Sequence, residues 1–495
     1  MTEPPPDALA ARIFPRLYRD SVSLMALAGR LEKEPGVQQA GVVMGTPANL
    51  EILGRSGMRP GDLRAGADDL VVVVRAADRG AADSALAAAE AGLTATSDPG
   101  VGTTEETRPG TVAEALAEDP ALTVACVSTP GAYAPVVAEQ ALRRGLHVFC
   151  FSDNVPLADE IRLKRMAVER RLLFMGPDCG TAVLDGVPLG FANVLRPGPV
   201  AIVAASGTGA QEVSCLLDSA GVGVSQIVGV GGHDLSADVG GLMTGLALDL
   251  VAEDPGTELV VVVSKPPARE AVERLLERLA RLGKPAVACL VGTEDADAPV
   301  PVRGTLEGGA LAAAALLGAQ LDLPDTPAPT PAPGIVLGLY TGGTLAAEAE
   351  VVLRGAGAPA ELVDFGDDEY TAGRPHPMID PAARAQHVAA AGRRTDVGVV
   401  LLDCVLGHGS SPDPATPLAE AVATARDEAA RDGRPLVVVG SVTGTDGDPQ
   451  RLAAQRRILL EAGVVLLPSN AAAARHAAAC ALAAPTPALA VEEAL

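Results

Sequence analysis

Short apolar runs alternate with stretches of helical spacing along almost the whole chain. Most of the runs lack polar interruptions, which is typical of strands buried on both faces of a parallel sheet. Strands that alternate with helices predict βαβ units. The expected fold class is therefore α/β, with three consecutive Rossmann-like or flavodoxin-like domains, each a doubly wound parallel sheet. The predicted strands are residues 41–44, 69–75, 122–128, 146–151, 172–175, 200–204, 225–230, 259–264, 286–291, 334–340, 361–365, 397–403, 436–441 and 464–467.

The domain boundaries follow from the length and from one proline-rich segment. A chain of 495 residues has room for about three domains. We place the first at residues 10–175, the second at 176–321 and the third at 334–490. Residues 322–333 contain five prolines, a composition that favours an extended, semi-rigid linker.

The polar turn after residues 200–204 is the first candidate site. The apolar run breaks abruptly into Ser206, Gly207 and Thr208, after which a helical pattern begins. A helix that starts there directs unpaired backbone N–H groups and the positive end of its dipole at one point, which favours an anion. The next strand ends in a second turn with His233 and Asp234, at the edge of the sheet where doubly wound folds bind ligands. A turn that serves only the fold is the simpler alternative.

The same strand, turn and helix pattern returns in the third domain, as Thr341, Gly342, Gly343 and Thr344. We expect the two helix starts to face each other across one phosphate or carboxylate group, so Gly207 and Gly343 should lie close together. Further candidates are polar residues of glycine- and proline-containing turns: Asp178, Cys179, Asp367, Arg374, His376, His408 and Asp446.

Composition excludes several function classes. Lys and Arg number 38 against 62 Asp and Glu, a net charge of −24, which makes nucleic acid an unlikely partner. The seven cysteines lack paired spacing, and we expect neither disulfides nor a metal site. No signal sequence or long apolar span is present, so we expect a soluble cytoplasmic protein without a membrane partner. No P-loop and no GxSxG turn occurs.

Several runs resemble known families. Residues 176–180 (GPDCG), 204–212 (AASGTGAQE) and 230–234 (VGGHD) are similar to stretches of the succinyl-CoA synthetase α subunit. The third domain resembles the flavodoxin-like CoA-ligase domain of the β subunit. The FdrA family matches best, through residues 20–25 (DSVSLM), 44–49 (MGTPAN), 340–348 (YTGGTLAAE), 364–381 (DFGDDEYTAGRPHPMIDP) and 444–450 (GTDGDPQ).

The departures from the synthetases bear on mechanism. In the synthetases the two matching helix starts receive a phosphorylated histidine, but here the corresponding loop places Glu307 or a neighbour at that position. Lys265 stands where the synthetases have a glutamate that contacts this histidine. A lysine is suited to hold an anion. The resemblance thus points to Lys265 and Glu307 as catalytic candidates, and His233 joins them because it lies in a glycine-containing turn at a strand end. CoA remains a possible cofactor, although MGTPAN replaces the glycine-rich CoA loop.

Three functions follow from the resemblance. The FdrA family is associated with purine and allantoin catabolism and with a heteromeric oxamate carbamoyltransferase, so we prefer a subunit that transfers an acyl or carbamoyl group. Its ligands would be carbamoyl phosphate, oxamate or an acyl-CoA, and it would work with partner subunits. The first alternative is an acyl-CoA synthetase subunit that lacks its own ATP-grasp domain. The second is a scaffold or regulatory subunit without turnover.

Overall fold

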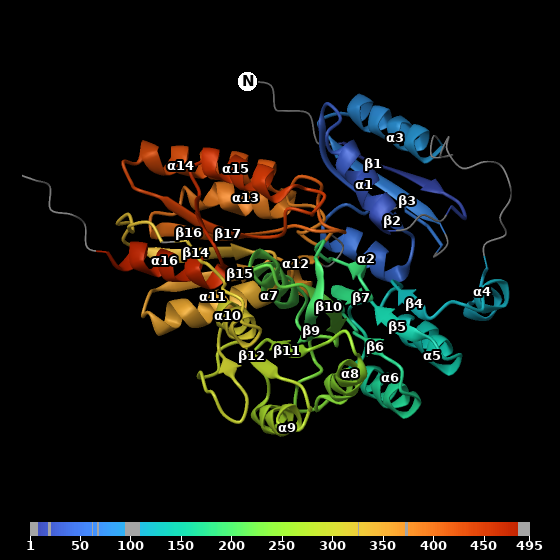
Figure 1. Ribbon diagram of the computed structural model, residues 1–495. Helices are drawn as coiled ribbons and strands as arrows, with labels where there is room; N and C mark the ends of the chain where they lie inside the picture. The colour runs from blue at the N-terminus through green and yellow to red at the C-terminus, as the bar shows by residue number, and fades with distance from the viewer. Residues whose placement is uncertain are drawn as a thin grey trace, which may run out of the picture. The chain divides into compact units, whose positions relative to one another are not determined.

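The computed structural model describes residues 8–17, 21–61, 63–66, 69–94, 109–324, 326–371 and 375–483. The chain forms two compact units (Figure 1). Unit 1 comprises Met1–Arg108 with Tyr370–Pro375, and unit 2 comprises Pro109–Glu369 with His376–Leu495. None of the described helices is both long enough and apolar enough to cross a bilayer.

Unit 1 contains a small antiparallel sheet. Its described elements are β1 (Ala8–Phe14), α1 (Ser21–Leu31), β2 (Val37–Met44), α2 (Pro47–Arg55), β3 (Leu70–Ala76) and α3 (Arg79–Thr94). The strand order is β1-β3-β2, and both neighbours run antiparallel to β3. The expected parallel sheet over residues 10–175 is therefore wrong for this part. The β3 strand is apolar over residues 70–74 because Val72 and Val74 pack on α1 and α3, whereas Val71 and Val73 pack on the other side against Leu50 and Leu53 of α2.

Unit 2 begins with a small parallel sheet of order β4-β5-β6. Its elements are α4 (Val112–Glu118), β4 (Val124–Val127), α5 (Ala134–Arg143), β5 (His147–Cys150), α6 (Leu157–Arg170) and β6 (Phe174–Met175). These are the later strands of the expected first domain, and here the parallel prediction is confirmed.

The next sheet, called the middle sheet below, has the order β13-β12-β11-β9-β10-β7-β8 in the described residues. Strands β9 to β13 are parallel, whereas the hairpin β7–β8 joins β10 in antiparallel orientation. The sequence pattern did not predict this hairpin. The elements are β7 (Thr181–Leu184), β8 (Val187–Gly190), β9 (Pro197–Ala205), α7 (Gly207–Ser219), β10 (Val224–Gly229), α8 (Leu242–Glu253), β11 (Leu259–Ser264), α9 (Arg269–Leu279), β12 (Ala286–Leu290), β13 (Val302–Arg303) and α10 (Leu306–Leu316).

The last sheet, called the C-terminal sheet below, is parallel throughout, with the order β15-β14-β16-β17-β18. Its elements are β14 (Ile335–Tyr340), α11 (Gly343–Gly355), β15 (Ala360–Asp364), α12 (Asp368–Thr371), α13 (Ala382–Ala391), β16 (Val397–Val405), α14 (Ala415–Arg431), β17 (Val437–Thr443), α15 (Leu452–Glu461), β18 (Val465–Leu467) and α16 (Asn470–Leu482). Every predicted strand coincides with or overlaps an observed one, and the α/β class is confirmed. The predicted boundaries at 176, 322 and 334 remain a proposal about domain organisation.

The middle and C-terminal sheets repeat one topology. If β9 to β13 are matched in chain order with β14 to β18, the two sheets have the same strand order. Helix α7 follows β9 as α11 follows β14, and α10 and α16 both follow the last strand of their sheet. These four helices lie between the two sheets (Figure 1) and share one hydrophobic core with both. Glycine and alanine make up most of the buried residues of α10 and α16, which lets the helices pack closely.

Candidate functional site

The starts of α7 and α11 meet directly. Ser206 caps α7 by accepting the Gly209 amide at 2.9 Å, and its hydroxyl donates to Thr344 Oγ1 of α11 at 2.7 Å. In the reverse direction, a methyl group placed on Gly342, the capping residue of α11, would lie 2.9 Å from Thr208 Oγ1. The capping residue of each helix thus faces the second residue of the other, as the repeated topology would produce.

Unpaired donors remain at this junction. The structure gives no acceptor, within the described residues, for the amides of Gly207, Thr208, Gly343 and Thr344. Gly207, Thr208 and Gly343 are partly exposed, whereas Ser206 and Thr344 are buried. The exposed side of the junction therefore combines two helix starts, the arrangement that favours an anion. Whether an anion binds there stays a prediction.

Part of the predicted α11 site is already occupied by a carboxylate of the chain. Asp403, at the end of β16, accepts the Thr341 amide at 3.0 Å, the Thr341 hydroxyl at 2.9 Å and the Gly342 amide at 2.8 Å. The guanidinium of Arg384, also buried, forms an ion pair with the same carboxylate. Donors from Thr341 and Gly342 are thus used within the fold, and the free part of the helix start begins at Gly343.

Lys265 follows β11 of the middle sheet directly, and its side chain reaches the start of α11. A methyl group on Gly343 would lie 3.0 Å from Lys265 Nζ and 2.3 Å from Asp364 Oδ2. Burial raises the pKa of Asp364 to about 6, although the Gly366 amide and the Lys265 ammonium favour its charged form. An exposed cation and a carboxyl group that titrates near neutral pH therefore flank the free end of α11. Asp364 was not among the predicted site residues.

His376 lies at the same turn. A methyl group on Gly366 would lie 2.9 Å from His376 Nε2, and Gly366 donates its amide to Asp364 at 2.9 Å. Burial lowers the pKa of His376 to about 4, so its imidazole is neutral near pH 7. Its Nδ1 accepts the Met378 amide at 3.2 Å. Of the candidate histidines His233, His376 and His408, His376 is the one that the described contacts place near the α11 start.

Glu307 has a different environment from the one that the resemblance implied. It lies in the first turn of α10, where it forms an ion pair with Arg475 at 2.6 Å and accepts a hydrogen bond from Ser469. Both partners belong to α16 or its cap. Within the described residues, the Glu307 carboxylate therefore makes no hydrogen bond to the first turn of α7 or of α11.

His233 and Asp234 belong to a separate cluster. Asp234 accepts the Thr244 amide and hydroxyl at the start of α8, and it forms a buried ion pair with Lys164 at 2.8 Å. Lys164 also binds Glu160, whose second oxygen lies 3.2 Å from His233 Nδ1. These contacts hold α6 against the β10–α8 connection, and Asp234 has a structural role there.

The remaining candidates are dispersed. Cys179 is buried, and burial raises the pKa of its thiol to about 12, which leaves it protonated and unreactive near neutral pH. Arg374 lies outside the described residues. The exposed candidates are Asp178, Asp367, His408 and Asp446.

Two buried glutamates were missed. Glu212 and Glu348 lie six residues after the capping residues Ser206 and Gly342. Glu212 of α7 accepts the Asn470 amide at the start of α16 at 3.0 Å, and Glu348 of α11 accepts the Leu306 amide at the start of α10 at 2.5 Å. Each glutamate therefore caps a helix of the other half. The repeated spacing was the signal that sequence inspection could have used.

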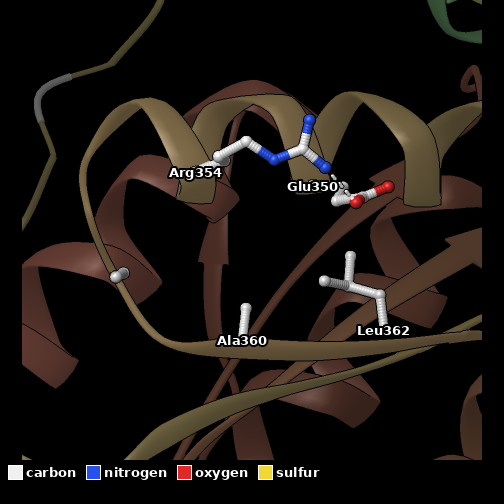
Figure 2. A pocket seen from close by; sticks show the side chains of 5 residues that line it. Glu350, Arg354, Ala360 and Leu362 are labelled. Carbon is white, nitrogen blue, oxygen red and sulfur yellow. Dashed lines mark hydrogen bonds and ion pairs between the residues drawn. The ribbon is translucent and has the colours of Figure 1, made fainter.

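A cavity of about 330 Å³ lies away from the two helix starts, beside the second half of α11 (Figure 2). Its lining comes from α11, the following turn and β15: Glu350, Arg354, Ala358, Ala360 and Leu362. It contains none of the predicted site residues.

Two family models match parts of the chain. A CoA-ligase model matches residues 339–480, and a model described as the AllF heavy metal-associated domain matches residues 7–109. The second region contains neither Cys nor His, the thiolate and imidazole ligands that soft metals require. The described residues contain no group of three or more His, Cys, Asp or Glu that could hold a metal ion.

One relative spans nearly the whole chain. The uncharacterized protein YahF of Escherichia coli is 37% identical over 498 residues, which cover 92% of this chain and 96% of YahF. Subunit α 1 of an ADP-forming succinate–CoA ligase from Archaeoglobus fulgidus is 31% identical over 186 residues, 37% of this chain and 62% of that subunit. The second match therefore concerns only part of each protein.

Among solved structures, the apo form of dinucleotide-forming acetyl-coenzyme A synthetase 1 from Ca. Korarchaeum cryptofilum is 17% identical and covers 72% of this chain and 82% of that one, with a TM-score of 0.32. A TM-score this low adds nothing to the strand order described above. The match to YahF over nearly its full length, together with the CoA-ligase and AllF models, shows that the chain belongs to the FdrA family and is related to the α subunits of succinate–CoA ligases.

Proposed function

We propose that the chain is a subunit of a multicomponent enzyme that transfers an acyl or carbamoyl group, and that it binds the phosphate or carboxylate of its substrate at the facing starts of α7 and α11. The observation that carries this proposal is the hydrogen bond between Ser206 and Thr344, which brings the two helix starts together beside Lys265. Each helix start stabilises an anion by about 0.3–1 kcal/mol when exposed, and by more when partly buried.

The expected chemistry is electrostatic. Amides of Gly207, Thr208 and Gly343, together with the Lys265 ammonium, would stabilise negative charge that develops on a transferring group. Asp364 is placed to exchange a proton near neutral pH, because burial raises its pKa to about 6. Glu307 would take no part in this step, because Arg475 and Ser469 hold its carboxylate.

An acyl-CoA ligase subunit is the second candidate. The CoA-ligase match over residues 339–480 and the succinate–CoA ligase relative favour it, and CoA would then be the cofactor. The residues that replace the glycine-rich CoA loop form the start of α2: Thr46 caps the helix by accepting the Asn49 amide at 3.3 Å, and the Asn49 side chain donates to Met44 at 2.9 Å.

Titration calorimetry on the full chain distinguishes the two candidates. Binding of carbamoyl phosphate and inorganic phosphate without a response to CoA supports carbamoyl transfer, whereas CoA binding with micromolar affinity supports the ligase. Lys265→Ala should weaken binding of either anion about tenfold, the effect of about 1.4 kcal/mol. Lys33→Ala, which removes an exposed lysine of unit 1, is the matched control and should change nothing. No response to any of these ligands contradicts the anion site.

Activity of the assembled complex tests the scaffold alternative. With partner subunits purified from the host, Lys265→Ala should reduce turnover about 10²-fold if this donor acts in the transition state. Full activity of that variant would instead favour a subunit that keeps the fold without chemistry. We further propose a cytoplasmic location, because all seven cysteines are free thiols, as expected in a reducing compartment.

A further inference from the structure

The repeated topology identifies an uncovered strand edge. In the middle sheet, β10 pairs with β9 on one side and with the hairpin strand β7 on the other. Its counterpart β15 pairs with β14 only, in the part of the chain that the structure describes. Among the described residues, the C-terminal sheet thus has no counterpart of the antiparallel strand that completes the middle sheet.

The backbone of β15 offers hydrogen-bonding groups to this edge. Pro359 accepts the Val336 amide and Phe365 donates to Tyr340, both at 2.9 Å, so the odd-numbered residues between them face β14. Because backbone groups alternate along a strand, the amide and carbonyl of Leu362 face the open edge. Neither group has a hydrogen-bond partner in the described residues. Leu362 corresponds to Ile227 of β10, whose partner across the edge is Val183 of β7.

A gap lies over the same strand, between aliphatic residues of β15 and charged residues of α11. Figure 2 shows the side chains of Ala360 and Leu362 directed into the space below Glu350 and Arg354, which form an ion pair along α11. The counterpart residues of the middle sheet, Val222, Val224 and Ile227, are at most 7% exposed and share a core with Val183. The gap of about 330 Å³ is therefore the place where an aliphatic side chain from an added strand would pack.

We propose that the edge of β15 pairs antiparallel with β15 of a second copy of this chain, across a two-fold axis at Leu362. In the middle sheet, the equivalent edge binds an antiparallel strand that places the aliphatic Val183 opposite Ile227, the counterpart of Leu362. A second copy of β15, in antiparallel orientation, would likewise place an aliphatic residue opposite Leu362. Two-fold pairing places Leu362 opposite its equivalent and Glu361 opposite Val363, so that no like charges stand directly opposite each other. Glu361 is already neutralised by Arg394 at 2.9 Å.

Light scattering coupled to size-exclusion chromatography of the full chain tests this proposal. The wild-type mass should be twice the 49.8 kDa of one chain, and Leu362→Lys should return it to 49.8 kDa, because two ammonium groups would face each other across the axis. Leu460→Lys makes the same change at a leucine of α15 that is 53% exposed, and it should leave the dimer intact.

Ala360→Lys is the second variant, since Ala360 is exposed in a single chain and the substitution does not threaten folding. It should weaken the dimer as well, and it decides the matter if circular dichroism shows that Leu362→Lys is misfolded. A wild-type mass of one chain would overturn the proposal that β15 pairs with a second copy. An assembly that both lysine variants leave unchanged would overturn it too.

Discussion

The middle and C-terminal sheets share one strand order, yet they fix the turn before their first helix by different means. At α7, Ser206 caps the helix with its own hydroxyl. At α11, the capping residue is a glycine, and a buried carboxylate from β16 holds the turn instead. The comparison shows that one backbone arrangement can depend on a local side chain in one copy and on a long-range ion pair in the other. Four predictions test this difference.

The largest effect is expected at Asp403. Asp403→Ala should lower the free energy of unfolding by about 3–5 kcal/mol, because it leaves the buried Arg384 without its partner. Urea denaturation followed by circular dichroism measures this. The double variant Arg384→Met/Asp403→Leu should recover part of the loss, since an apolar pair replaces the charges. A loss of stability no larger than that of Ser206→Ala would show that the turn before α11 depends on the long-range ion pair no more than the turn before α7 depends on its local cap.

The second prediction concerns pH. Burial raises the pKa of Glu348 to about 8, above its value of 4.5 in an unfolded chain. The unfolded state therefore releases its proton first, and stability should fall as pH rises between these two values, by up to about 1.4 kcal/mol per pH unit. Glu348→Gln should flatten that slope in denaturation curves recorded from pH 5 to pH 8. An unchanged slope would assign the pH dependence to other groups.

Methyl groups at the two helix starts should have unequal effects. Gly343→Ala places a methyl group 2.3 Å from the Asp364 carboxylate, whereas the nearest atom to a methyl on Gly207 is Thr181 Oγ1 at 3.1 Å. Gly343→Ala should thus cost about 1–3 kcal/mol of stability, and Gly207→Ala less. Gly355→Ala, in α11 with nothing within 4 Å, is the control and should be neutral or stabilising. Equal losses at Gly343 and Gly207 would contradict the described packing.

The smallest effect is expected for the contact between the helix starts. Ser206→Ala should cost about 1 kcal/mol through loss of the cap. A double-mutant cycle with Thr344→Val should show a coupling of about 0.5–1.5 kcal/mol, the contribution of one hydrogen bond. A coupling near zero would mean that the two hydroxyls contribute nothing to each other in solution.

Much of this architecture was visible in the sequence, because buried parallel strands and polar turns leave local signals. The apolar run of β3 was misleading, since a central strand covered on both faces looks the same in parallel and antiparallel sheets. The β7–β8 hairpin could have been predicted from the Asp-Gly pair at residues 185–186, a common sequence for two-residue hairpin turns. Asp185 and Gly186 both adopt the positive φ that such a turn requires.

The candidate site was harder to predict. The strand pattern and the repeated turn located Ser206 and Gly343, because a helix start depends on neighbouring residues. Asp403 and Arg384 meet across the fold, and only the tertiary structure reveals that Asp403 uses the donors of Thr341 and Gly342. A carboxylate inside an otherwise apolar strand was the one available hint. Glu307 was assigned by resemblance alone, which carries no information about Ser469 and Arg475.

The exchange of caps between α7 and α16 and between α11 and α10 has a consequence for how the polypeptide could be divided. Cutting the chain in the proline-rich segment would leave each of the four described sheets within one fragment, yet each fragment would keep a helix whose terminal amide relies on a glutamate in the other fragment. Neither piece would be self-sufficient. The two fragments would have to be produced together and reassociate, because each supplies a carboxylate that caps a helix of the other.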